Sequence, residues 1–119
     1  MGVNLFLVFA GGACGALSRY VLSLFIKRLV SSPFPVATFL INLIGSFLLG
    51  FFISLDLPSE LLLLLGVGFM GSFTTFSTFQ LENVTLFENR HYKTLVLYVF
   101  ASIFFCVMAA LVGLTISPL

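Results

Sequence analysis

One stretch decides the fold of this chain: Gly71-Ser72-Phe73-Thr74-Thr75-Phe76-Ser77-Thr78-Phe79. It lies inside a long apolar segment but is a poor helix, because glycine is flexible, threonine is β-branched and the hydroxyls compete for backbone hydrogen bonds. In hydrocarbon, a broken helix leaves amide and carbonyl groups that only protein, an ion or a water-filled cavity can satisfy. The break therefore has two readings: a site for an ion or solute, or a kink packed by a neighbouring helix.

The composition indicates an integral membrane protein. The 119 residues are 61% hydrophobic and 8% charged, with a mean hydropathy of +1.25, whereas a soluble domain carries about 25% charged residues. The net charge is only +1 and there is no basic patch, so nucleic-acid binding is set aside. The N-terminus has no basic region and its apolar stretch is too long for a signal peptide, so the first segment is expected to stay in the mature protein.

Four apolar segments are each long enough to cross about 30 Å of hydrocarbon at about 1.5 Å per residue. They cover about residues 5–26, 36–55, 61–86 and 94–116. The connectors between them are too short to fold alone. We therefore expect an all-α membrane protein with a single four-helix transmembrane domain over residues 1–119, its third helix broken near the middle.

Positive charge is distributed unevenly among the loops. The residues flanking the first and third loops are Lys27, Arg28, Arg90 and Lys93, whereas the second loop carries Asp56 and Glu60. Because loops rich in lysine and arginine stay in the cytoplasm, the bias predicts that the first and third loops are cytoplasmic and that both termini lie outside.

Small residues recur at helical spacing, which lets membrane helices approach closely. They are Gly11 with Gly15, Ser46 with Gly50, and Cys106, Ala109, Ala110 and Gly113 in the last segment. Their number predicts more helix contact than four helices need, and so a homodimer or a closely related heterodimer; packing within one subunit is the alternative. Cys14 and Cys106 match no metal spacing and are expected to be small buried residues.

Two polar side chains lie inside the first two segments. An arginine such as Arg19 costs about 2.5–3.5 kcal/mol at a membrane centre, so it should face protein or water. Either it draws an anion into a vestibule or it clamps carbonyls at a helix end, and the clamp is the preferred reading. Asn42 either donates its amide hydrogens to an anion or cross-links two helices.

The last segment carries a stripe of Tyr98, Ser102 and Cys106 at four-residue spacing. Tyrosine and serine supply hydroxyl donors along this stripe, whereas a thiol is a weak donor. No enzyme chemistry is indicated, because the one histidine lies in a loop, no carboxylates are paired within the membrane and no nucleophile has a base nearby.

Phe76 and Phe79 are three residues apart and share a helix face, with Ser77 and Thr78 between them pointing elsewhere. A phenyl edge is electropositive and can meet a small anion, although core packing is the usual role of such a pair. Glu82, one turn beyond Phe79, is either a vestibule charge or a solvated acid.

Three motifs occur in order: Gly-x-x-Gly-Ala-x-x-Arg-Tyr at 12–20, Asn-x-x-Gly-Ser-Phe at 42–47 and Gly-x-x-Thr-Thr-Phe-Ser-Thr-Phe-x-x-Glu at 71–82. With the four segments and the chain length, they resemble the Fluc family of small microbial fluoride channels. The third motif is the most specific. The resemblance implies an antiparallel, dual-topology dimer in the bacterial plasma (inner) membrane, which exports fluoride passively through two pores.

The resemblance also implies roles for individual residues. Phe76 and Phe79 match the pore phenylalanines, whose ring edges face fluoride, and Asn42 matches the pore asparagine. The residues that match the polar track, the vestibule and the last-helix lining of the pore are Ser77, Thr78, Glu82, Tyr98 and Ser102. The backbone carbonyls of Gly71 and Thr74 match the ligands of a structural sodium ion held between the two subunits.

Two features depart from the family's pattern. Cys106 stands where members often place a hydroxyl, and a thiol there would slow permeation or impair one of the pores. The charge bias is stronger than a dual-topology homodimer needs and fits one chain of a heterodimeric pair, although the intact pore motifs favour the homodimer.

Two other classes stay open as alternatives. A multidrug-type four-helix transporter needs a carboxylate at mid-membrane, usually in the first helix, where this chain has Arg19 instead. A structural or assembly subunit would use the broken helix only for packing, which leaves the clustered hydroxyls unexplained.

Overall fold

The computed structural model describes residues 2–116, and all regular secondary structure within them is helical. The elements are, in chain order, α1 (Gly2–Leu29), α2 (Val36–Ser54), α3 (Ser59–Leu62), η1 (Leu63–Met70), α4 (Gly71–Phe73), α5 (Ser77–Glu88) and α6 (Tyr92–Thr115). In this range, four spans are long and apolar enough to cross a membrane: Asn4–Leu29, Val36–Ser54, Ser59–Glu88 and Tyr92–Thr115. The predicted all-α fold, with four long apolar helices and an interrupted third, is confirmed.

Three of these helices run past the predicted segment ends, into residues that carry charge. α1 continues through Lys27 and Arg28, and the third span starts at Ser59 and ends at Glu88. Long charged side chains lie along a helix and keep their heads at the membrane surface, so the helical backbone continues beyond the apolar segment. α2 ends at Ser54, because the backbone of Leu55 is extended.

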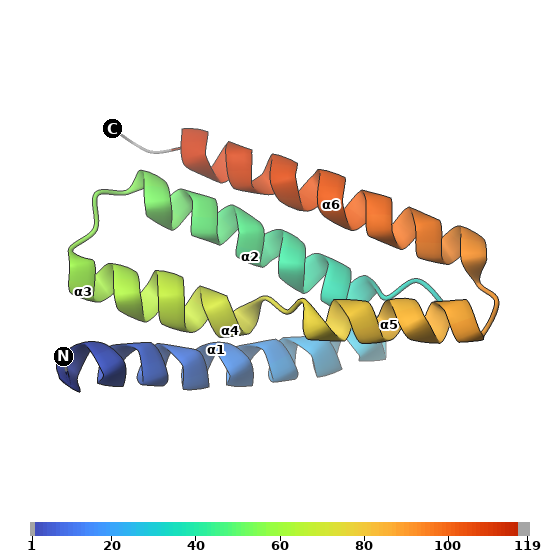
Figure 1. Cartoon of the computed structure of the whole chain (residues 1–119), viewed down its shortest axis with the longest axis horizontal. Helices are drawn as coiled ribbons and strands as arrows, with labels where there is room; N and C mark the ends of the chain where they lie inside the picture. The colour runs from blue at the N-terminus through green and yellow to red at the C-terminus, as the bar shows by residue number, and fades with distance from the viewer. Residues whose placement is uncertain (1, 117–119) are drawn as a thin grey trace.

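The helices pair side by side along their lengths. α2 packs mainly against α6, and α1 packs mainly against η1 and α4, which form the first half of the third span (Figure 1). An added Cβ at Gly11 or Gly15 would meet the backbone of η1, and one at Gly50 would meet the Ala110 carbonyl oxygen. These small residues therefore pack the helices of one chain together, the alternative left open from the sequence, and their number is no argument for a dimer.

The third span is interrupted between α4 and α5, where a short non-helical link joins the two halves (Figure 1). The first half ends with a hydrogen bond from the Thr74 N–H to the Met70 carbonyl (3.1 Å), and the second begins with one from the Gln80 N–H to the Phe76 carbonyl (2.9 Å). Thr74 is extended, with a ψ of 155°. The preceding element η1 is a π-helix, a winding that is often found near functional sites and that the sequence did not predict.

A small hydrophobic core lies next to the interruption. It consists of Ile26, Ala37, Ile41, Met70 and Phe73, contributed by α1, α2, η1 and α4. The outer faces of the helices expose many large hydrophobic side chains, as a lipid-facing surface does. The prediction that both cysteines are buried is wrong for Cys14, whose side chain is exposed on such an outer face of α1.

Candidate functional site

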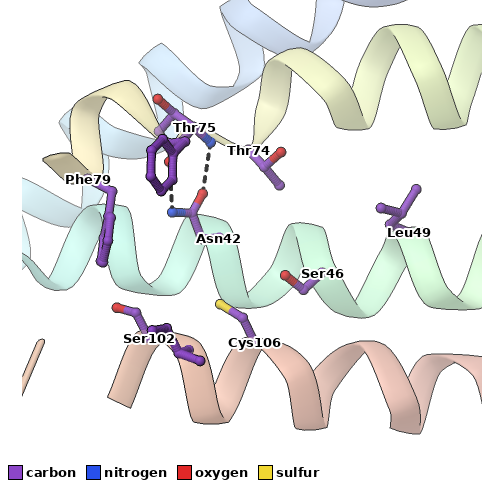
Figure 2. Close-up of a pocket in the computed structure, with 10 residues that line it drawn as sticks. Asn42, Ser46, Leu49, Thr74, Thr75, Phe79, Ser102 and Cys106 are labelled. Carbon is purple, nitrogen blue, oxygen red and sulfur yellow. Dashed lines mark hydrogen bonds between the residues drawn. The ribbon is translucent and has the colours of Figure 1, made fainter. Parts of the chain in front are cut away.

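The interruption is held by one side chain of α2. The Nδ2 group of Asn42 donates to the Thr75 carbonyl (3.0 Å), and the Thr75 N–H donates to Oδ1 of Asn42 (2.9 Å). Figure 2 shows both bonds bridging α2 to the link between α4 and α5. Asn42 thus cross-links two helices, one of its two predicted roles, and its NH₂ group still carries a second hydrogen.

These bonds change which backbone carbonyls have partners. In a continuous helix, the Thr75 N–H would bond to the Gly71 carbonyl, and the Thr78 N–H to the Thr74 carbonyl. Here the Thr75 N–H goes to Asn42, and the Thr78 N–H donates to the Thr75 hydroxyl oxygen (3.2 Å). The carbonyls of Gly71 and Thr74 are therefore both deprived of their helical partners, by two side chains acting in the same way.

Other hydroxyls of the stretch satisfy carbonyls nearby. The Ser72 hydroxyl donates to the Gly12 carbonyl of α1 (2.6 Å), and the Thr74 hydroxyl donates to the Met70 carbonyl (2.9 Å). The Thr75 hydroxyl lies 3.2 Å from the Thr78 hydroxyl and 3.4 Å from that of Ser77. The hydroxyls clustered in this stretch thus replace part of the backbone hydrogen bonding that the helix loses at the interruption.

A cavity of about 320 Å³ lies beside Asn42, between α2, α6 and the interruption. Asn42 and Ser46 reach it from α2, and Ser102 and Cys106 reach it from α6 (Figure 2). Ser102 is only 7% exposed, and its hydroxyl has no hydrogen-bond partner among residues 2–116. A buried donor without a partner is costly unless a ligand or water completes it, so this hydroxyl is available to either.

Aromatic rings close one side of this cavity. Phe76 and Phe79 both line it, with ring centroids 6.0 Å apart and planes tilted by 35°. Phe79 also lies 4.9 Å from the fully buried ring of Tyr98, whose hydroxyl donates to Oε1 of Glu82 (3.1 Å). Tyr98 therefore supports Phe79 and holds Glu82, and its own hydroxyl hydrogen is engaged by the carboxylate.

A second cavity, of about 240 Å³, borders Thr75 and is lined by basic and hydroxyl side chains. Arg19 and Lys27 supply the positive charge, and Thr38 and Thr78 supply hydroxyls. Among residues 2–116, Arg19 makes no hydrogen bond to the carbonyls beside the break, and it is Asn42 that bonds the Thr75 carbonyl. The Arg19 side chain borders this second cavity. Whether Arg19 acts as a clamp or as a vestibule charge stays a prediction.

The structure separates the residues of the third motif as their spacing predicts. Phe76 and Phe79 line the first cavity, whereas Thr78 lines the second. Thr75 lines both and supplies its peptide group and its hydroxyl, a role that its place in the sequence does not predict. The small-residue pattern predicts only packing for Ser46, although its position one turn after Asn42 on α2 is a signal that it shares the cavity.

The fold and these cavities define a class of protein: a small multi-pass membrane protein whose third span is broken beside a cavity with polar and aromatic walls. Comparison with known proteins narrows the class. The family model described as CrcB-like protein, Camphor Resistance (CrcB), matches residues 6–114, and the chain belongs to this family.

Relatives match the chain over nearly its full length. It is 42% identical over 115 residues to the fluoride-specific ion channel FluC 2 of Bacillus thuringiensis subsp. konkukian, covering 97% of this chain and 98% of the relative. It is 45% identical over 117 residues to the fluoride-specific ion channel FluC 1 of Listeria monocytogenes serotype 4b, covering 98% and 99%. The resemblance drawn from the three motifs is confirmed. Both relatives carry the names of ion channels, which supports the prediction of a non-enzyme and disfavours the transporter and structural alternatives.

Proposed function

We propose that this chain forms a fluoride-selective channel, which lets fluoride leave the cytoplasm passively across the bacterial plasma membrane. The observation that carries the proposal is the unpartnered Ser102 hydroxyl in a cavity shared with Asn42, in a chain 42% and 45% identical to fluoride-specific channels. Fluoride is a small and strongly hydrated anion. A pore must therefore replace its water with donors held close together.

The first cavity supplies such donors without trapping the ion. Ser102 offers a hydroxyl, Asn42 offers its second amide hydrogen, and Phe76 and Phe79 offer electropositive ring edges. The side chains that line this cavity are uncharged. Fluoride would therefore be held by several weak contacts, which allows it to leave again, and the larger chloride ion would be excluded by width.

The second cavity is suited to be the entrance of the pore. Arg19 and Lys27 attract an anion, and Thr78 with the neighbouring Ser77 gives hydroxyls that lead from there towards Thr75, which borders both cavities. Glu82, held by Tyr98, lies near Lys27 at the wall of a further pocket. This order assigns Arg19 to the vestibule, and Asn42, the phenylalanines and Ser102 to the narrow path.

An antiparallel homodimer with two pores would cover two positions near the interruption that are exposed in a single chain. Phe76 is 72% exposed although it lines the first cavity, and an added Cβ at Gly71 would meet no atom within 4 Å. A second copy would cover both positions. The bias of Lys27, Arg28, Arg90 and Lys93 towards one side keeps a heterodimer with a related chain as the second candidate.

A structural sodium ion between the subunits fits the carbonyls of the interruption. The residues 2–116 contain no group of three His, Cys, Asp or Glu side chains that could hold a metal, so carbonyl oxygens are the suitable ligands. Those of Gly71 and Thr74 have lost their helical partners, and a hard cation prefers such oxygens. The ion would supply positive charge that draws these carbonyls from two copies together.

The test is ion efflux from liposomes that contain only this chain. Fast fluoride efflux with no chloride efflux is the expected result, and it would make the homodimer the working assembly. Efflux of both ions would overturn the selectivity. If neither ion leaves, reconstitution with a related chain from the same organism distinguishes the heterodimer, which restores fluoride efflux, from a chain that is not a channel.

A further inference from the structure

We propose that Cys106 is a modification site for small uncharged thiol-directed reagents, with mercury(II) chloride as the type example, and that modification there stops fluoride flow. The modification would regulate ion flow through the first cavity, so the inference rests on the proposed channel function.

Cys106 belongs to the wall of the cavity. Its thiol is free and half-buried, and it lines the same cavity as Ser102, which precedes it by one turn of α6. Figure 2 shows Cys106 and Ser102 on the side of α6 that faces Ser46 and Asn42 of α2. The Ser102 hydroxyl on the same wall is 7% exposed and has no partner in the described part of the chain, so it is free to donate to a ligand in this cavity.

The surroundings select for an uncharged reagent. The side chains that line the cavity are uncharged, and α2 and α6 both belong to membrane spans. A charged thiol reagent would lose its hydration there without gaining a counter-charge. Mercury(II) chloride is neutral and crosses lipid, and a soft metal prefers a thiolate to the oxygen ligands around it.

The reaction is a ligand exchange at mercury. The S–H bond of Cys106 and one Hg–Cl bond break, an S–Hg bond forms, and a proton and a chloride ion leave. Mercury stays in the +2 state with one chloride still bound, so no oxidant or reductant is needed. An added thiol such as dithiothreitol takes the metal back and regenerates Cys106.

The bound group would occupy the path of the ion. The cavity, of about 320 Å³, has room for a chloromercury group. A chloromercury group on Cys106 lies one turn from Ser102, in the space where fluoride would exchange water for the donors of α2 and α6. Cys14 provides an internal comparison, because it is exposed on α1 and does not line this cavity.

The experiment measures fluoride efflux from liposomes before and after mercury(II) chloride, each variant being compared with its own untreated rate. Cys14→Ser, which keeps only Cys106, should lose at least about tenfold in rate, corresponding to about 1.4 kcal/mol, and should recover with dithiothreitol. Cys106→Ser, which keeps only Cys14, should keep its untreated rate. Equal sensitivity of the two variants, or a Cys14→Ser channel that reacts with mercury and still conducts fully, overturns the inference.

A second measurement needs no ion flow. The rate at which the thiol of the Cys14→Ser protein reacts with mercury(II) chloride is followed in fluoride and in nitrate at equal ionic strength and with no added chloride, so that the neutral reagent is the same in both salts. Fluoride should slow the reaction, because the ion occupies the same cavity, and equal rates in both salts overturn the inference. If the protein carries no fluoride but shows this protection, the channel proposal fails and the thiol site stands.

Discussion

The two ends of α2 make different kinds of contact with the rest of the chain. Towards its C-terminus, Gly50 packs against the backbone of Ala110, and Gly113 of α6 packs against that of Phe47. Towards its N-terminus, Asn42 makes two hydrogen bonds to the peptide group of Thr75. We refer to these as the packed end and the bonded end of α2.

The difference shows that one end of α2 holds the helices together and the other end forms the candidate site. At the packed end, both helices satisfy their own backbones, and close approach is gained by removing side chains. At the bonded end, the partner helix is interrupted, and side chains of Asn42 and Thr75 take over the bonds that the ladder has lost. The unpartnered Ser102 hydroxyl and the first cavity lie at the bonded end, which is where we place the proposed path of the ion.

The largest effect is expected at the packed end. Gly113→Leu adds a side chain where an added Cβ would already lie 2.8 Å from the Phe51 nitrogen, so α2 and α6 must separate. We expect a loss of about 3 kcal/mol of stability, measured as a lower thermal midpoint and a smaller yield of monodisperse protein in detergent. Gly66→Ala is the control, because an added Cβ meets only the flexible Leu62 side chain at 3.4 Å. Equal losses of stability in both variants would show that the close approach of α2 and α6 is not the reason for the effect of Gly113→Leu.

At the bonded end, Asn42→Leu should act on cation binding as well as on stability. The Thr75 N–H and carbonyl lose their partner, which costs about 2 kcal/mol, and the N–H becomes free to return to the Gly71 carbonyl. If the proposed sodium ion binds, sodium chloride should raise the thermal midpoint over N-methylglucamine chloride, and this rise should shrink or vanish in Asn42→Leu.

Ser46→Ala is the matched control for Asn42→Leu, because Ser46 lies one turn further along α2 and lines the same cavity. It should keep the sodium-dependent rise. A full sodium effect in Asn42→Leu would show that the freed Gly71 carbonyl is not a ligand of the ion. It would leave the hydrogen bonds of Asn42 with a purely structural role.

Most of the fold was predictable because it depends on local properties of the sequence. Length and hydropathy define the four spans, and the glycine and hydroxyl cluster around Thr74 locates the interruption. The contact between Asn42 and Thr75 was not predictable, since their positions relative to each other depend on how α2 packs over Phe73 and Met70. The surroundings of Arg19 were not predictable for the same reason, because its cost in lipid is local but the cavity that it borders is formed by tertiary packing.

A smaller effect, confined to ion flow, is expected for the aromatic wall of the bonded end. Phe76→Ile removes a ring edge but little packing within one chain, where Phe76 is 72% exposed. Fluoride efflux should fall about tenfold, or about 1.4 kcal/mol, while the dimer stays assembled; Phe79→Ile should do the same with some loss of stability, because Phe79 contacts Tyr98. Phe100→Ile is the control, since Phe100 is 69% exposed on α6 outside this cavity. Unchanged efflux in both Phe76→Ile and Phe79→Ile would contradict the role of the ring edges.

The smallest effect should come from Ser72, which belongs to the hydroxyl cluster but bonds α1 rather than the cavity. Ser72→Ala removes the 2.6 Å hydrogen bond to the Gly12 carbonyl, and a bond between membrane helices is worth about 0.6 kcal/mol. The thermal midpoint should fall slightly and fluoride efflux should not change. In Thr115→Ala, the lost hydroxyl bonded only the Val112 carbonyl of its own helix, so the midpoint should move less. If Ser72→Ala instead lowers efflux as much as Phe76→Ile, the contact between α1 and α4 also contributes to ion flow. The functional region would then not be confined to the bonded end of α2.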